Sequence, residues 1–137
     1  MQESSFVLHN DFLQKKQIYN TPTTIALLEN NLHNPWIILV PKIAGAVELI
    51  DLSHSQQLHI LEEINKISHI FKAHFGAEKL NIATLGNVTP QLHFHIITRY
   101  KSPQKDRHFP KPLFGLECEK MDETSYTNRV KEILKYL

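Results

Sequence analysis

The sequence predicts a single α+β domain built on an antiparallel sheet. Its 137 residues suit one hydrophobic core, and they contain no internal repeat. Apolar and β-branched segments of strand length lie before and after one long amphipathic pattern. Strands, a helix, strands and a second helix in that order are typical of α+β proteins. We therefore expect residues 1–137 to form one domain, with a core region at about 24–100 and a C-terminal loop and helix at 101–137.

The first twenty residues are mixed in composition and predict only one element. Asn10 or Asp11 is suited to cap a short helix that contains Phe12, Leu13 and Ile18. This is the weakest of the local patterns, because the apolar residues are few and irregularly spaced.

Two strands are predicted next, joined by a short polar turn. Thr23–Leu28 is apolar and β-branched and ends at a Glu-Asn-Asn sequence. Trp36–Val40 is a continuous apolar run between Pro35 and Pro41. Trp36 is the first residue of this apolar run. We therefore expect it to pack in the core rather than to stack on a bound base.

The clearest helix begins near Asp51 or Ser53, where Ser53 and Gln56 have the spacing of a capping box. Gly76 is suited to end it in a left-handed cap. Apolar residues recur between these points at helical spacing and predict one buried face. They are Leu58, Leu61, Ile64, Ile67, Ile70 and Phe71.

The second half of the chain predicts two strands and a terminal helix. Leu80–Leu85 and Gln91–Tyr100 have strand patterns, with a turn at Gly86–Pro90. Three prolines then interrupt a polar and aromatic loop at Lys101–Gly115. The terminal helix is predicted by apolar spacing at Tyr126, Val130, Ile133, Leu134 and Leu137.

Composition excludes several classes of partner. The formal charge of +1 gives no broad positive field, so we expect no polynucleotide partner. Cys118 is the single cysteine, which excludes an intrachain disulfide and favours a reducing compartment. The sequence has no apolar run of about 18 residues and no signal-peptide pattern in Met1–Ser5. We expect a cytoplasmic protein without a membrane partner.

The segment Gln91–Tyr100 is the most informative for function. Side chains alternate in a strand, so Gln91, His93 and His95 face one side while Leu92, Phe94 and Ile96 face the other. Neutral imidazole attacks phosphorus well near pH 7, and the phosphoramidate that forms can be hydrolysed. The pattern predicts a phosphate-directed site, provided that the three polar side chains face a cavity together.

The same residues resemble the signature of the histidine triad (HIT) superfamily, His-φ-His-φ-His-φ-φ with φ apolar. Gln91–Ile97 matches it with glutamine at the first histidine, Gly86-Asn87 is similar to an upstream Gly-Gln pair, and Val40-Pro41-Lys42 resembles the strand end before the family's helix. The resemblance covers about 30–100. It implies a five-stranded antiparallel sheet with a main helix and a C-terminal helix, a homodimer, and a small-molecule nucleotide as ligand.

The resemblance also implies roles for individual residues. His93 is the nucleophile, His95 its phosphate-binding partner, and Gln91 the third member of the catalytic row. Asn87 contacts the phosphate, with Gly86 and Thr89 in the same substrate-binding turn. Asn30 contacts the ribose, although Asn31 and Asn34 are alternatives. The loop at 101–115, with basic and aromatic residues such as Arg107 and Phe109, is a candidate to close over the nucleotide.

The sequence is compatible with three functions. The first is a nucleotide hydrolase or nucleotidyl transferase that forms a nucleotidyl-histidine, acting on dinucleoside polyphosphates or nucleoside phosphoramidates without a cofactor. The second is a catalytically weak nucleotide-binding module or sensor, because Gln91 cannot transfer a proton near neutral pH. The third is zinc-dependent hydrolysis, for which His93 and His95 lack a third ligand. The helical residues His54, His59, His69 and His74 favour solvent or packing roles, so no metal is expected.

Overall fold

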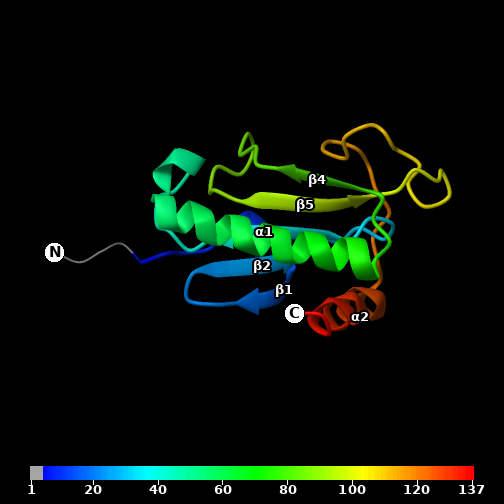
Figure 1. Cartoon of the computed structure of the whole chain (residues 1–137), viewed down its shortest axis with the longest axis horizontal. Coiled ribbons are helices and arrows are strands. Elements are labelled where there is room, and N and C mark those ends of the chain that lie inside the picture. The colour runs from blue at the N-terminus through cyan, green and yellow to red at the C-terminus, as the bar shows by residue number, and fades with distance from the viewer. Residues whose placement is uncertain (1–4) are drawn as a thin grey trace.

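The computed structural model describes residues 5–137 and contains one five-stranded antiparallel sheet in the order β1-β2-β3-β5-β4 (Figure 1). This confirms the predicted architecture. The strands are β1 (Lys16–Asn20), β2 (Thr24–Leu28), β3 (Trp36–Pro41), β4 (Lys79–Ala83) and β5 (Phe94–Arg99). The helices are α1 (His54–His74), α2 (Glu123–Leu134) and two short 3-10 turns, η1 (Asn10–Phe12) and η2 (Leu49–Asp51).

Helix α1 forms where the capping signals place it. Ser53 is the N-cap, its hydroxyl accepts from the Gln56 amide at 3.2 Å, and the Gln56 side chain accepts from the Ser53 amide at 2.8 Å. After the C-cap Phe75, Gly76 adopts a positive φ of 64°, which a residue without Cβ tolerates. Both ends of the predicted helix are confirmed.

The buried face of α1 differs from the predicted one. Ile60, Ile64, Ile67 and Phe71 pack in the cluster with the sheet and Ile70 is also buried, whereas Leu58 and Leu61 are 47% and 51% exposed. Including these two leucines in the core was wrong. Their directions on the helix differ from that of the Ile60–Ile64–Ile67–Phe71 stripe, so they flank it and leave an apolar groove at the helix surface.

The N-terminal prediction is wrong beyond its first turn. The turn η1 spans only Asn10–Phe12, and His9 rather than Asn10 or Asp11 caps it. Ile18 belongs to strand β1, which pairs with β2 across a register shift between Gln17 and Tyr19. A single buried side chain and a bulge leave no alternation in the sequence, so this strand gave no local signal.

Strand β5 is shorter than predicted, and Gln91–His93 precede it. The ladder with β3 ends at the pair Leu39↔Phe94. Beyond it, other groups take the backbone hydrogen bonds. The Thr84 hydroxyl donates to the His93 carbonyl at 2.7 Å, and the Leu92 amide donates to the Ala46 carbonyl at 3.0 Å. The extended direction continues without a strand partner, so the alternation of side chains is preserved.

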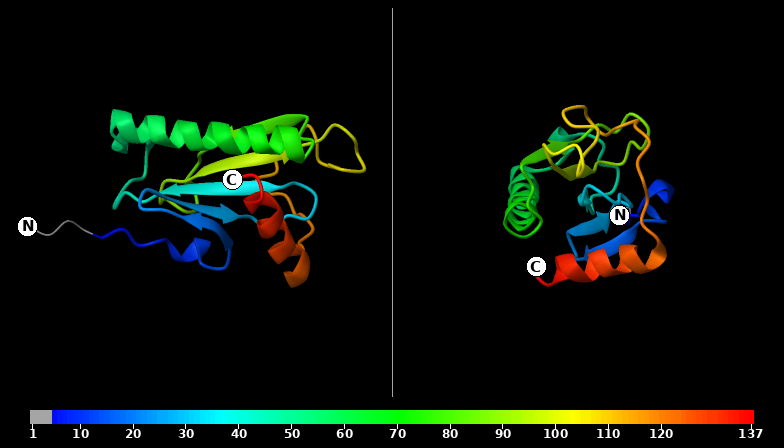
Figure 2. Two further views of the ribbon diagram at one scale, coloured as in Figure 1. Left: turned by 60° about the horizontal axis from the view of Figure 1, so that its bottom comes forward. Right: turned by 90° about the vertical axis from the view of Figure 1, so that its right-hand side faces the viewer.

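The two faces of the sheet carry separate apolar clusters. Leu92, Phe94 and Ile96 pack with the buried stripe of α1. Trp36 and Ile97 lie in a second cluster with Phe12 and Leu113. Figure 2 shows α1 and the blue η1 segment on opposite sides of the sheet. The first cluster therefore contains side chains of α1 and α2, and the second contains side chains of the N-terminal segment and of the loop after β5.

The loop after β5 is fixed by a buried ion pair. Arg99 Nε donates to Asp106 Oδ2 at 2.8 Å, and Asn34 Nδ2 donates to the same oxygen at 3.0 Å. Arg99 is 1% exposed and Asp106 3%, so these groups anchor the loop to the sheet. Within residues 5–137, no helix has the length and apolar character that crossing a membrane requires.

Candidate active site

Two imidazoles lie side by side where the chain enters β5. The ring centroids of His93 and His95 are 4.9 Å apart. The two residues are buried, with 6% and 8% of their surface exposed. Both rings are on the face opposite α1, because Leu92, Phe94 and Ile96 take the α1 side. The predicted alternation is confirmed for this stretch.

The hydrogen bond of His93 determines which ring nitrogen is free. Its Nδ1 lies 2.7 Å from the Gln91 carbonyl oxygen. A carbonyl can only accept, so Nδ1 carries the proton in the neutral ring. Nε2 then has an available lone pair. The backbone carbonyl two residues earlier thus holds the His93 ring with an unprotonated Nε2.

The opposite tautomer is imposed on His95. The indole Nε1 of Trp36 lies 3.0 Å from His95 Nδ1. An indole N–H can only donate, so Nδ1 of His95 accepts and its proton lies on Nε2. The pair thus combines one bare Nε2 with one Nε2–H, which suits attack on phosphorus beside a donor to a phosphoryl oxygen.

Burial keeps both rings neutral near pH 7. Desolvation lowers the pKa of His93, with smaller contributions from the positive charges of Lys15 and His9 against the opposing hydrogen bond to Gln91. Desolvation also lowers the pKa of His95 to about 3, helped by His93 and Lys15. A neutral ring is the form in which a nucleophilic nitrogen has its lone pair.

The Gln91 side chain was predicted to lie beside the two imidazoles, but it points to the N-terminal segment instead. Its Oε1 accepts from the His9 amide at 2.8 Å, and its Nε2 donates to the Val7 carbonyl at 2.8 Å. Both ends of the amide are occupied by the N-terminal segment. The structure therefore brings together two members of the predicted row and directs the third to another part of the chain.

The turn before β5 holds the other predicted substrate contacts. Gly86 has a positive φ of 72°, and a Cβ there would lie 3.6 Å from the Thr89 carbonyl oxygen. Asn87 is exposed and makes no side-chain hydrogen bond to the described residues. Thr89 Oγ1 donates to Asp11 Oδ2 at 2.6 Å. Of the three, Asn87 has its amide available for a ligand.

Asn30 is engaged elsewhere. Its Nδ2 donates to the Met121 carbonyl at 3.3 Å, and its Oδ1 accepts from the Met121 amide at 2.7 Å. Asn31 Oδ1 accepts from the Asn34 amide, while Asn34 Nδ2 binds Asp106. The side-chain NH2 groups of Asn30 and Asn34 are thus occupied, whereas that of Asn31 makes no hydrogen bond to the described residues.

Aromatic side chains cover the imidazole pair. The Phe12 ring meets His93 edge-on at 5.0 Å, and the Phe114 ring meets His95 edge-on at 4.8 Å. Sequence reasoning did not assign Phe12, Phe114 or Trp36 to the site. No local signal could have done so, because Phe12, Trp36 and Phe114 are 81, 57 and 21 residues away from His93 in the chain. The cavity expected in front of the pair is thus closed by side chains.

The four histidines of α1 are not part of this pair. His54, His59, His69 and His74 are exposed on α1, and His74 stacks on Tyr136, in agreement with the solvent or packing roles predicted for them. Among residues 5–137, no three His, Cys, Asp or Glu side chains are placed to hold a metal ion together.

The fold is that of an α+β protein with an antiparallel sheet. Its candidate site is a pair of histidines with fixed tautomers at the start of an inner strand. A model of the HIT domain matches residues 12–102. The chain belongs to the HIT domain family. This match begins earlier than the resemblance in the sequence, because it includes β1 and β2.

Solved structures agree over nearly the whole chain. A histidine triad protein from Bradyrhizobium japonicum is 33% identical, with a TM-score of 0.87, and the alignment covers 97% of this chain and 98% of that one. A histidine triad protein from Marinobacter aquaeolei is 32% identical with a TM-score of 0.89, covering 98% and 97%. A histidine triad protein from Sinorhizobium meliloti is 30% identical with a TM-score of 0.88, covering 96% and 97%. A search of curated protein sequences gave no match.

Proposed function

We propose that this protein transfers or hydrolyses a nucleotidyl group through a covalent intermediate on His93. HIT-family proteins are nucleotide-binding hydrolases and transferases. The observation that supports the proposal most is the pair of opposite tautomers at 4.9 Å, one imposed by the Gln91 carbonyl and the other by Trp36. Two buried imidazoles held in opposite tautomers are more typical of a functional site than of histidines at the surface.

The proposed reaction has two steps. His93 Nε2 forms a bond to the α-phosphorus as the bond from phosphorus to the leaving group breaks, and the electron pair of that bond goes to the leaving group. Water then attacks phosphorus and forms a P–O bond, the P–N bond breaks with its electron pair returning to Nε2, and the proton lost by the water goes to solvent. His95 Nε2–H donates to a phosphoryl oxygen throughout. The Gln91 carbonyl holds the Nδ1 proton while the ring carries positive charge.

Gln91 narrows the substrate class. Its amide cannot protonate a leaving group. Phosphates leave as stable anions, whereas an amine must gain a proton as it leaves. We therefore propose that dinucleoside polyphosphates are better substrates than nucleoside phosphoramidates, whose amine leaving group must take its proton from solvent.

The test is a panel of adenosine and guanosine polyphosphates and phosphoramidates with wild type and His93→Ala. We expect turnover in wild type, covalently labelled protein in quenched reactions, and loss of both in the variant. Turnover by His93→Ala together with unlabelled wild-type protein would contradict the proposal.

A nucleotide-binding module with little turnover is the second candidate, favoured by the closed cover over the imidazoles and by Gln91. It predicts nucleotide binding without hydrolysis. Gln91→His tests it, with Gln91→Leu as the matched control because both variants remove the contacts to Val7 and His9. A gain in hydrolysis in the histidine variant alone shows that an acid was missing, and equal rates show that the added imidazole contributes nothing.

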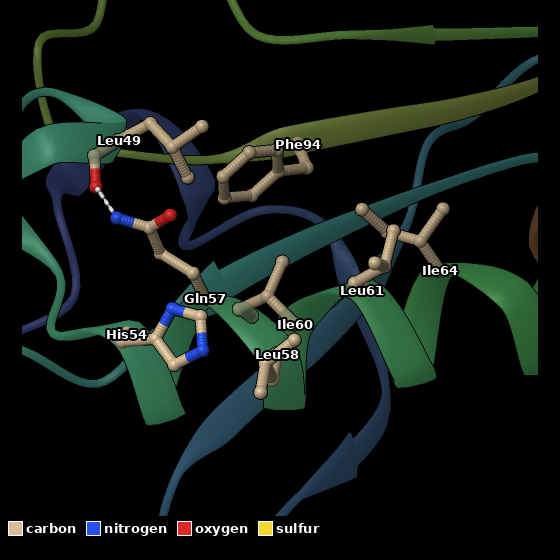
Figure 3. Close-up of a pocket in the computed structure, with 8 residues that line it drawn as sticks. All are labelled: Leu49, His54, Gln57, Leu58, Ile60, Leu61, Ile64 and Phe94. Carbon is tan, nitrogen blue, oxygen red and sulfur yellow. Dashed lines mark hydrogen bonds between the residues drawn. The ribbon is translucent and has the colours of Figure 1, made fainter.

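We also propose a homodimer that buries the apolar groove beside α1. Leu49, Leu58 and Leu61 line this groove with Phe94 from β5 (Figure 3). The edge strand β4 adds Ile82, which is 50% exposed. A second copy of the chain offers the same apolar surface, as a two-fold interface requires. Leu58→Lys with Leu61→Lys should give monomers in light scattering, whereas Leu134→Lys on α2 should not.

A further inference from the structure

The N-terminal segment Phe6–Phe12, here called the N-terminal strap, lies on the imidazole side of the sheet. Except for Phe12, it precedes the part of the chain that matches the HIT domain. Phe6 and Leu8 pack against the second apolar cluster, while Val7 between them is 76% exposed. This alternation resembles a strand, but the described strands form no ladder with it. Its hydrogen bonds come from side chains of the loop before β5.

Gln91 supplies two of these hydrogen bonds. Its Oε1 and Nε2 bind the His9 amide and the Val7 carbonyl, each at 2.8 Å. An amide side chain presents a donor and an acceptor at one end, as a peptide group does, and so satisfies two backbone groups of one strand. An imidazole cannot do this, because its two nitrogens point apart, and a carboxylate lacks the donor. Gln91 at the first triad position therefore has a physical role of its own.

The rest of the strap reaches the catalytic pair. Thr89 Oγ1 donates to Asp11 Oδ2 at 2.6 Å, and His9 Nδ1 accepts from the Asp11 amide at 3.0 Å. These contacts place η1 so that Phe12, which is 3% exposed, meets the His93 ring at 5.0 Å. The covering contact on His93 depends on a short segment at the end of the chain.

We propose that the N-terminal strap is a movable cover of the nucleotide site and that Gln91 is the positioning residue that anchors it closed. The proposal rests on the proposed function only for the identity of the ligand. Opening the strap exposes His93 Nε2 without disturbing the helix-covered core. Opening breaks the hydrogen bonds of Gln91 and Thr89 and removes Phe6, Leu8 and Phe12 from the second apolar cluster, so it is a local unfolding of the N-terminal segment.

The test measures how fast diethyl pyrocarbonate modifies His93, by peptide mass mapping of the full chain without nucleotide. This reagent needs the same neutral nitrogen as the proposed reaction. Gln91→Leu should raise the rate at His93 about tenfold, since two hydrogen bonds that favour the closed form are lost. Gln91→Glu should raise it too, because the carboxylate faces the Val7 carbonyl without a donor. His69 on α1 is an internal standard that should not change.

A second variant guards against misfolding. Thr89→Val removes only the contact to Asp11, and should also accelerate modification of His93 while circular dichroism and the melting temperature show a folded protein. An unchanged rate at His93 in folded Gln91→Leu and Thr89→Val would overturn the proposal.

A binding arm with AMP separates the strap from the proposed function. AMP should associate faster with Gln91→Leu than with wild type, and it should accelerate hydrogen exchange of the His9 amide in wild type. If His93 modification rises but AMP binds neither protein, the strap stands and the nucleotide function fails. If AMP binds both while the modification rate is unchanged, the function stands and the strap fails.

Discussion

The two faces of the segment 92–96 are buried to a similar degree by different means. Phe94 and Ile96 lie under α1, a helix of 21 residues, in a continuous apolar cluster. His93 and His95 lie under Phe12, from the short turn η1, and Phe114, from the loop after β5. Burial on the first side comes from the main helix-covered core. Burial on the second side comes from the N-terminal strap and the loop after β5. Low exposure alone therefore does not tell whether a side chain is permanently inaccessible.

The largest effect expected from this difference is on stability. Ile96→Ala, at a residue with no exposed surface, should lower the free energy of unfolding by about 2–5 kcal/mol. Gln91→Leu on the other side should lower it by only about 1–3 kcal/mol, for two hydrogen bonds. Urea unfolding with matched m-values measures both. Equal losses would show that the strap belongs to the same cooperative unit as the core.

The pH dependence of stability should come from the imidazole side. Both histidines have a pKa lowered by burial, so below pH 6.5 the unfolded chain binds more protons than the folded one. The stabilisation is complete above pH 6.5 and is lost as pH falls, for His95 toward its folded pKa of about 3. The slope can reach about 1.4 kcal/mol per pH unit for each ring.

Urea unfolding between pH 7.5 and 5 measures this slope. His95→Phe keeps an aromatic ring and removes one titrating group, so its slope should be smaller. A variant slope equal to that of wild type would mean that His95 has an ordinary pKa in the folded protein.

Trp36→Phe should have a smaller effect that is confined to the site. It retains an aromatic side chain but removes the donor to His95 Nδ1, which leaves a buried acceptor unpaired at a cost of about 1–3 kcal/mol. The ring nitrogen shifts of His95 in NMR should change from the single Nε2–H tautomer to a mixture. Unchanged shifts would show that Trp36 does not select the tautomer.

The smallest effect is expected at the exposed histidines of α1. His69→Gln should change the unfolding free energy by less than about 0.5 kcal/mol and leave the slope between pH 7.5 and 5 unaltered. A larger change in slope would mean that the imidazoles on the sheet are not its main source.

Prediction from sequence succeeded where a local pattern had one structural solution. Ser53, Gln56 and Gly76 gave the ends of α1, and the alternation at 92–96 gave the two faces. It failed at Ile18, whose strand has one buried side chain and a bulge, and at Leu58 and Leu61, whose burial depends on which stripe of α1 meets the sheet. In each failure the deciding contact is with a residue far along the chain.

The site divides in the same way. The sequence by itself determined the antiparallel sheet, the long helix and the pair of histidines on one side of a strand, because periodicity and capping act over a few residues. Only the tertiary structure decided the protonation of His95, the contacts of the Gln91 side chain with the strap and the covering of the imidazoles by aromatic rings. These depend on Trp36, Val7 and Phe12, which come next to the histidines through folding alone.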